Sequence, residues 1–448
     1  MSSIAVTSSR PAPAAEPARS RAEATAAGPV WIAALLFYAA MLPREIRLQF
    51  GQFVIFPDRA YMYAMTPFIL MAIARGALRF RPIDTCVFGA AAWMIVAMMA
   101  NYGFADGLER GGAQAFDTVL AYLIGRISVR SLHDLRRLLV FVAPGFAISG
   151  GIMLLESVSR RLILQPLAQS VFGPLPVYLS GEEAGVQNRA GEIRLGLMRA
   201  QAGFPHSILA GVFLASGLGL YLFGWLKMPP KMAGIAGSLF GFFSLSSAAI
   251  LALMVTAGLT AYEFLQRRIR ELNWPLLIGA VIAVATVIQI ASKSGLVSVF
   301  VRYFTLSPAT GYFRTLIWEY GLLSVSNYPI FGIGFEGYER PTWVVTESID
   351  AHWLLLAVRY GIPSALLLTG FFVGAITLVA RASSRLPMAD LMTMRGLAFA
   401  LVTLFLTGFT VAFTGGIFAY FIALAGIGIT ISHNLQTQAA AGPQTGAA

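Results

Sequence analysis

One arginine and one histidine stand out in this sequence as residues that could carry chemistry. Arg314 lies in GYFRTLIWEYG, whose spacing predicts a short amphipathic helix with Trp318 one turn further on. His352 lies in SIDAHWLLLAVRYG, where Asp350 is predicted to cap the start of a helix. An imidazole can take a proton from a hydroxyl near neutral pH, and a guanidinium can bind a phosphate through two parallel N–H bonds. These residue types predict a base at His352 and an anion-binding group at Arg314. The alternative for His352 is a polar residue at the entry of a helix, without a role in chemistry.

The segment that follows Arg314, SNYPIFGIGFEGYERP, contains a proline and several glycines that predict a tight turn. One hypothesis is that Arg314 and the backbone amides of this turn together bind a lipid diphosphate at the membrane surface. The alternative is an arginine that snorkels from an interfacial helix, with Trp318 as its anchor. The sequence leaves both open.

Four more residues are candidates for substrate binding because they lie in the two longest loops of the predicted membrane region, residues 156–206 and 293–359. Most surface arginines form salt bridges or remain inert, so a structural role is the alternative for each of these arginines. Carboxylates between residues 336 and 350 also leave open a carboxylate base or a divalent cation, although their spacing predicts no metal site. The four candidates are Arg199, Arg302, Glu339 and Arg340.

Several kinds of enzyme are poor hypotheses for this chain. It has no HExxH zinc-protease motif, no GxxxxGK[ST] phosphate-binding loop and no GxSxG nucleophile elbow. Cys86 is the only cysteine, so an intramolecular disulfide, a thiolate zinc site and an iron–sulfur cluster are excluded. We therefore predict neither a cofactor nor a metal.

The composition predicts the elements that must position these residues. Of the 448 residues, 57% are hydrophobic and 12% are charged, whereas soluble domains carry about 25% charged residues. The apolar residues form blocks long enough to cross a bilayer as helices, and they do not alternate as barrel strands would. We predict an all-α, polytopic integral membrane protein of about 12 transmembrane helices. The predicted spans are residues 29–42, 61–73, 85–102, 113–127, 135–155, 207–226, 232–245, 247–265, 276–292, 361–380, 398–411 and 415–431.

The charge distribution predicts the orientation and the domain organisation. With the N-terminus inside, 18 of the 32 basic residues and the whole net charge of +11 fall on the cytoplasmic side. Loops 156–206 and 293–359 then lie outside, in the periplasm. Residues 1–28 and 432–448 are predicted to be disordered cytoplasmic tails around a membrane domain at 29–431. Attraction to anionic lipids accounts for the basic charge, so nucleic acid is not a predicted partner.

The order of several motifs resembles that of the O-antigen ligase and polysaccharide polymerase superfamily. The motifs are RAQAGFPHSILAG, FSLSSAAILALMV, FRTLIWEYGLLSVSNYPIFGIGFEGYERP and DAHWLLLAVRYGIPSALLL, and the opening LPREIRLQFGQFVIFPDRAYM resembles exopolysaccharide polymerases. The resemblance covers roughly residues 41–431. It implies a GT-C-like membrane glycosyltransferase of the bacterial inner membrane, in which an undecaprenyl-diphosphate-linked glycan is transferred to a hydroxyl on the periplasmic face. His352 and Arg314 match the family's catalytic histidine and arginine, and Arg199 matches an arginine before the next span.

Alternatives within and outside this family remain open. A polymerase of exopolysaccharide or O-antigen repeat units is the first hypothesis, and a ligase that moves glycan onto lipid A core is the second. Either would have the lipid-linked glycan and the bilayer as partners, together with a chain-length regulator or other polysaccharide-assembly proteins. A flippase or transporter would show charges within spans, whereas Asp117 and Glu263 are predicted near span ends. A structural scaffold is the remaining alternative.

Overall fold

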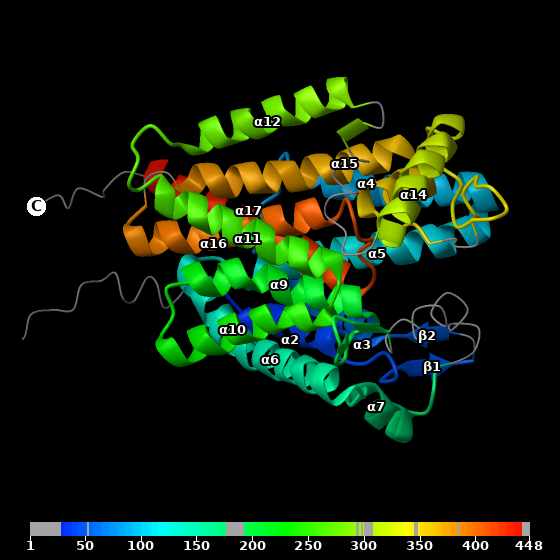
Figure 1. Ribbon diagram of the computed structural model, residues 1–448, viewed down its shortest axis with the longest axis horizontal. Helices are drawn as coiled ribbons and strands as arrows, with labels where there is room; N and C mark the ends of the chain where they lie inside the picture. Colours follow the sequence, from blue (N-terminus) through cyan, green and yellow to red (C-terminus); the bar gives the residue numbers. More distant parts are fainter. Residues whose placement is uncertain are drawn as a thin grey trace, which may run out of the picture.

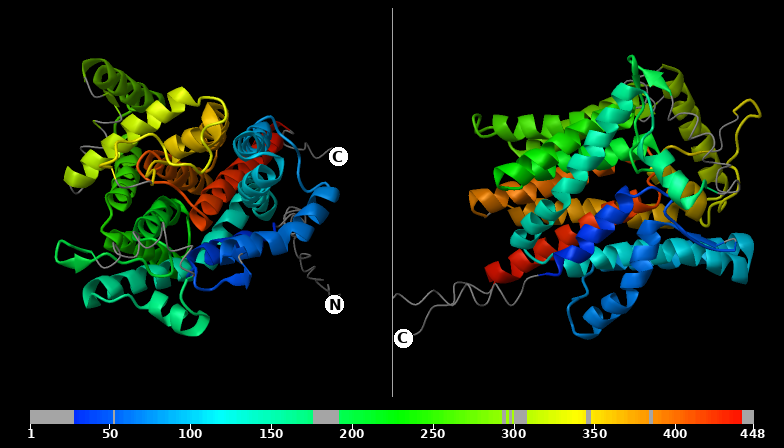
Figure 2. Two further views of the ribbon diagram at one scale, coloured as in Figure 1. Left: turned by 90° about the vertical axis from the view of Figure 1, so that its right-hand side faces the viewer. Right: turned by 90° about the horizontal axis from the view of Figure 1, so that it is seen from below.

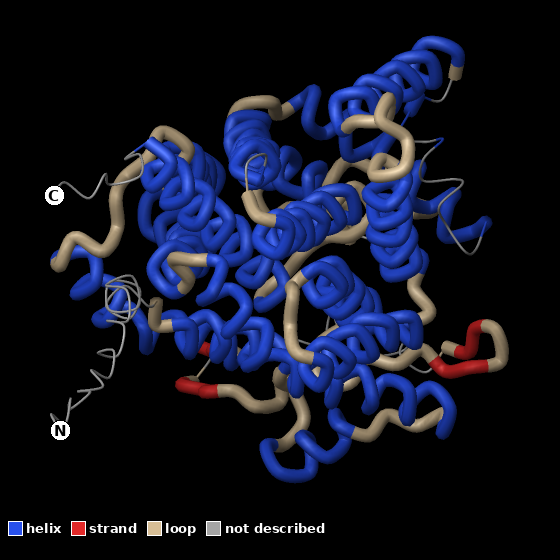
Figure 3. Tube along the Cα trace, turned by 90° about the vertical axis from the view of Figure 1, so that its left-hand side faces the viewer, coloured by secondary structure: helices blue, strands red, loops and turns tan. Residues whose placement is uncertain are grey.

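The computed structural model describes residues 28–51, 53–175, 192–292, 295, 296, 299, 308–344, 348–383 and 386–440. This part of the chain is almost entirely helical, as predicted. Strands occur there only in two small antiparallel hairpins (Figure 3), β1 (Leu48–Phe50) with β2 (Phe53–Ile55) and β3 (Ile193–Arg194) with β4 (Leu197–Met198).

Seven of the described helices are long and apolar enough to cross a membrane, namely α4, α6, α11, α12, α15, α16 and α17. Each of the twelve predicted spans overlaps a helix of the structure. The helices are α2 (Val30–Met41), α3 (Pro57–Ala74), α4 (Asp84–Tyr102), α5 (Phe104–Ser128), α6 (Leu132–Ser159), α7 (Leu164–Phe172), α9 (Ser207–Phe223), α10 (Met228–Phe240), α11 (Ser247–Leu265), α12 (Trp274–Ala291), α14 (Pro308–Asn327), α15 (His352–Ala382), α16 (Met388–Thr407) and α17 (Gly416–Ala440), with a 3-10 turn, η1 (Gly241–Ser244), after α10.

The helices run along the long axis of the molecule, and its two ends differ (Figure 1). One end carries the start of α2, the end of α17 and the loop that joins α11 to α12. The opposite end carries the β1–β2 hairpin, α7 and α14. The described parts of the two long loops therefore lie at the same end, which we call the loop end.

Helix α17 forms the centre of the bundle. It is apolar on all sides, and most of its side chains are buried against α2, α5 and α15. Its Tyr420 ring lies 4.7 Å from the ring of Phe37, and its Phe421 ring stacks on Phe372 at 3.8 Å. Helix α12 has the opposite environment, because none of its side chains is buried. It lies on the outside of the bundle (Figure 1).

The predicted helix around Arg314 is confirmed as α14, but its apolar side chains are spread around the helix and do not gather on one face as an amphipathic helix would have them. It lies across the loop end of the bundle rather than along the bundle axis (Figure 1, Figure 2). Helix α15, which follows it, is broken at Gly361, where φ is 82°. A Cβ at this position would lie 1.9 Å from the carbonyl oxygen of Ile330, so only glycine lets the turn after α14 pack into the break.

Two expectations about helix ends are wrong. Helix α17 continues to Ala440, so the start of the predicted disordered tail at 432–448 is helical. Asn434 explains the extension in part, because its side-chain amide donates to the carbonyl of Arg130 at 2.8 Å. Helix α5 begins at Phe104 and not at residue 113, so Asp117 lies in the interior of a helix. Residues 1–27 and 441–448 lie outside the described part of the chain.

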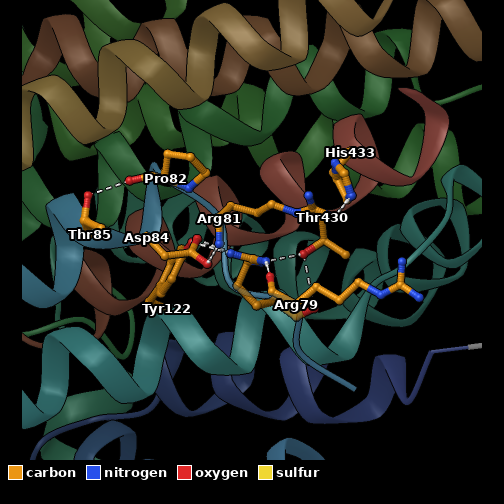
Figure 4. A network of polar contacts seen from close by, with 9 residues as sticks. Arg79, Arg81, Pro82, Asp84, Thr85, Tyr122, Thr430 and His433 are labelled. Atoms are coloured by element: carbon orange, nitrogen blue, oxygen red, sulfur yellow. Dashed lines mark hydrogen bonds and ion pairs between the residues drawn. The ribbon is translucent and has the colours of Figure 1, made fainter. Parts of the chain in front are cut away.

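A buried network lies at the end of the bundle opposite α14 (Figure 4). Its central residue is Arg126, at the end of the predicted span 113–127, which the charge distribution placed on the cytoplasmic side. Arg126 forms an ion pair with the fully buried Asp84 and donates to Tyr122 Oη at 2.6 Å. It also donates to Thr430 Oγ1 and to the Arg79 carbonyl, each at 2.9 Å. These bonds tie α4, α5 and α17 together. Part of the positive charge at this end is therefore structural.

Candidate functional site

The connection between α16 and α17, residues 408–415, is the meeting point of the candidate site, and we call it the 408–415 loop. The amide of His352 donates to the carbonyls of Gly408 at 2.7 Å and Val411 at 3.1 Å. These bonds satisfy the first N–H of α15, whose N-cap residue is Ala351 without a side-chain cap. The prediction that Asp350 caps this helix is therefore wrong, because the loop takes the place of the cap.

The same loop also holds the ring of His352. Its Nδ1 accepts a hydrogen bond from the Phe413 amide at 3.3 Å, and the rings of Trp353, Phe413 and Phe418 lie 5.0–5.3 Å away. A neutral imidazole that accepts at Nδ1 carries its proton on Nε2. Among the described residues this buried Nε2 has no hydrogen-bond partner. A buried donor left unbonded costs about 1–3 kcal/mol, which a substrate oxygen would offset.

Helix α14, which carries Arg314, is bonded to the loop through Trp318. Trp318, one helical turn further along, stacks on the Phe409 ring and donates from Nε1 to the Phe409 carbonyl at 3.3 Å. The side chain of Arg314 is only 5% exposed. A snorkelling arginine keeps its charged group in water, so this burial argues against the snorkelling alternative.

The Gly-rich turn after α14 has a different role from the one expected. The amides of residues 332–336 all donate within the protein, with Ile333 bonded to the Val358 carbonyl at 2.8 Å and Phe335 to Tyr102 Oη at 2.6 Å. These five amides are therefore not available to bind a diphosphate. The turn instead packs into the break of α15 and fixes the short segment that begins with His352.

Arg199 lies at the base of the β3–β4 hairpin. It is 2% exposed, and its guanidinium donates to Glu192 Oε2 at 3.2 Å and to the Ser244 carbonyl at 3.3 Å. Burial raises the pKa of Glu192, but the bonds and charges of Arg194 and Arg199 outweigh it and hold that pKa below its ordinary value. These contacts pin the hairpin to the corner between α10 and α11, and they fit the salt-bridge alternative for Arg199.

Glu339 and Arg340 organise the chain between α14 and α15. Both carboxylate oxygens of Glu339 accept from the Asn327 amide, at 3.0 and 2.9 Å. Arg340 donates from Nε to the Val344 carbonyl at 3.0 Å. Both remain candidates for substrate binding, and Arg302 lies outside the described residues.

A second polar group lies at this loop beside Gly415. It consists of Asp58 and Arg44, which were not among the residues predicted to form the site. Gly415 has φ 52°, and a Cβ built on it would lie 3.3 Å from both Asp58 Oδ2 and Arg44 Nη2. Burial raises the pKa of Asp58, while the charge of Arg44 opposes the rise. The sequence does carry a signal for this group, because LPREIR and PDRAY place charges at the facing ends of two neighbouring predicted spans.

Among the described residues, no group of three or more histidine, cysteine, aspartate or glutamate side chains could hold a metal ion. Comparison with known protein families finds no match for this chain, and comparison with curated proteins also finds none. Its function is therefore argued from the ordered motifs and from the geometry around the 408–415 loop.

Proposed function

We propose that this chain is a membrane glycosyltransferase that joins undecaprenyl-diphosphate-linked repeat units into an exopolysaccharide. The observation that carries the proposal is that Arg314 and His352, which the motif resemblance pairs, are both buried, and that the helix of Arg314 and His352 itself are each bonded to the 408–415 loop. The first attachment runs through Trp318 and the second through the backbone and ring of the histidine itself.

The chemistry of such a transfer suits these groups. A diphosphate is a good leaving group once its developing charge is neutralised, and a guanidinium can do this with two parallel N–H bonds. The effect is larger in a site shielded from water, and Arg314 is shielded in that way. A lipid diphosphate already carries the activation energy for transfer, so no nucleotide site is required.

The position of α14 is also suited to a lipid-linked donor. A helix that lies across the end of a bundle of apolar helices is placed where the headgroups of a bilayer meet the protein. Arg314 would then meet the diphosphate while the lipid chain stays among the membrane-facing helices. With the orientation that the charge distribution predicts, this end faces the periplasm.

The proposal is tested with the lipid-linked glycan that a strain lacking this chain should accumulate. Purified wild-type chain in vesicles should convert that glycan, without any added acceptor, into a ladder of longer products. Arg314→Lys keeps the charge but loses the planar fork, so we expect its rate to fall by about 10²–10³-fold at unchanged membrane level. The matched control is Arg161→Lys, an exposed arginine at the same end, which should keep the wild-type rate.

Two results would count against the proposal. If the strain accumulated no lipid-linked glycan and the wild-type chain produced no ladder, the transferase function would be rejected. A wild-type rate from Arg314→Lys would leave the function standing but would return Arg314 to an anchoring role.

A further inference from the structure

We propose that His352 acts in this transfer as a hydrogen-bond donor to the leaving diphosphate, and that Asp58 is the base that takes the proton from the acceptor hydroxyl. The inference rests on the proposed function and assigns the two roles within it. It changes the expectation from sequence, in which His352 is the base.

The hydrogen bonds of His352 carry the first half of the inference. A base needs an open lone pair, and the imidazole has one on each ring nitrogen that lacks a proton. The Nδ1 lone pair is occupied by the Phe413 amide, and Nε2 then carries the proton. In this arrangement the ring can donate a hydrogen bond from Nε2 but cannot accept a proton there. A phosphate oxygen is a strong acceptor for such a donor.

The environment of Gly415 carries the second half. A Cβ at this position would lie 3.3 Å from both the Asp58 carboxylate and the Arg44 guanidinium, closer than an ordinary contact, so glycine lets both charged groups lie directly against the loop. Thr414 and Gly415 are exposed, whereas the ring of His352 is covered. An acceptor hydroxyl can therefore approach Asp58 from solvent while the diphosphate is held on the buried side of the loop.

The spacing along the loop fits a displacement reaction. Phe413 contacts His352 and Gly415 contacts Asp58, and two residues of extended chain span at most about 7 Å. The acceptor and the leaving group lie on opposite faces of the sugar in a direct displacement. Paired carboxyl groups that serve those two faces in inverting glycoside hydrolases are about 6.5–9.5 Å apart. The two positions at which His352 and Asp58 meet the loop therefore lie within about the span of one sugar ring.

The neighbouring charges favour Asp58 over Asp117 as the base. The charged and titratable groups around Asp58 are Arg44, Arg59, Asp117 and Tyr63. Asp117 is committed to an ion pair with Arg59, whose Nε donates to it at 2.8 Å. Burial raises the pKa of Asp58 from its ordinary value, which makes its carboxylate a stronger base near neutral pH.

The step balances without an oxidant or a metal. The acceptor oxygen forms a bond to the anomeric carbon, and the bond from that carbon to the diphosphate oxygen breaks with its electron pair on the diphosphate. The proton of the acceptor hydroxyl moves to Asp58, which later releases it to water. The proton on His352 Nε2 stays in place and is shared in a hydrogen bond with a phosphate oxygen.

The test compares variants at both positions with the lipid-linked glycan from the deletion strain as donor. Asp58→Asn should slow transfer by about 10²–10⁴-fold, and Asp58→Glu, which keeps a carboxylate, should recover part of the rate. His352→Gln places an N–H near the position of Nε2 and should be at least about tenfold faster than His352→Ala. Asp106→Asn, an exposed acid at the loop end, is the matched control and should behave as wild type.

Two further readouts separate the roles. The acid limb of the pH–rate profile should remain in His352→Gln and disappear in Asp58→Asn. Nitrogen NMR of the histidine-labelled chain, assigned with His352→Gln, should show the proton of His352 on Nε2, and this measurement needs no donor. A proton on Nδ1, or a wild-type rate from Asp58→Asn, would overturn the inference. Inactive wild-type chain would instead overturn the proposed function, while the NMR result would still stand.

Discussion

Glu156 offers the sharpest test of how the loop end is held together. This residue lies near the end of α6 and is fully buried. Its Oε1 accepts from the amides of Ile163 at 3.0 Å and Leu164 at 3.4 Å, and its Oε2 accepts from those of Gln201 at 3.0 Å and Ala202 at 2.9 Å. One carboxylate therefore joins α6, the start of α7 and the RAQAG segment before α9.

Glu156→Gln keeps the size of the side chain but replaces one of its two oxygens with an NH2 group. That group cannot accept, so two backbone N–H groups lose their partner and face another donor. Each buried donor left unbonded costs about 1–3 kcal/mol, so the variant should lose about 2–6 kcal/mol of local stability. The lower bound corresponds to about a 30-fold change in an opening equilibrium.

Hydrogen exchange in vesicles measures this opening directly. Peptides that contain the amides of residues 163–164 or 201–202 should exchange at least about 30-fold faster in Glu156→Gln. Glu109→Gln, an exposed glutamate on α5, is the control and should leave exchange unchanged. Equal exchange in Glu156→Gln and the wild type would show that the four bonds do not stabilise this region.

Three shorter predictions follow from the orientation, the helix break and the hairpin. A tag after Arg130 should report the cytoplasm and a tag within residues 339–344 should report the outside, because the excess of arginine and lysine lies on the side predicted to be cytoplasmic. External labelling of the tag after Arg130 would reverse the predicted orientation. Gly361→Ala should lower the stability of the fold by more than about 1–2 kcal/mol in thermal unfolding, because the positive φ and the Ile330 carbonyl both oppose a side chain. The control is Gly370→Ala in the same helix, where a Cβ meets nothing within 4 Å, and this variant should be neutral or stabilising. The lowered pKa of Glu192 means that its ion pairs stabilise the β3–β4 hairpin above about pH 4.5 and lose this effect as pH falls further. Relative to the intrinsic exchange rate at each pH, the protection of the hairpin amides should therefore fall on acidification in the wild type but not in Glu192→Gln.

The sequence by itself determined that the protein belongs in a lipid bilayer, and it determined most of the helices. Apolar blocks of membrane length, separated by short charged segments, can form only helices in a bilayer, because every backbone group must be bonded within its own segment. That constraint is local, so it can be read from one stretch of chain at a time. The pattern of residues around Arg314 also predicted a helix there, and the structure confirms it as α14.

Which distant segments meet cannot be read from any local stretch of the chain, and the tertiary structure alone decided it. Nothing local shows that the 408–415 loop bonds to His352 and Trp318 or that Gly415 faces Asp58. The tautomer of His352 likewise depends on the Phe413 amide, which is remote in sequence. The glycines after α14 look the same whether their amides bind a ligand or a neighbouring helix, and only the packing of that turn into the break at Gly361 distinguishes the two. Hydrogen bonds between remote segments form when the chain packs, and the chemistry of this site depends on those bonds.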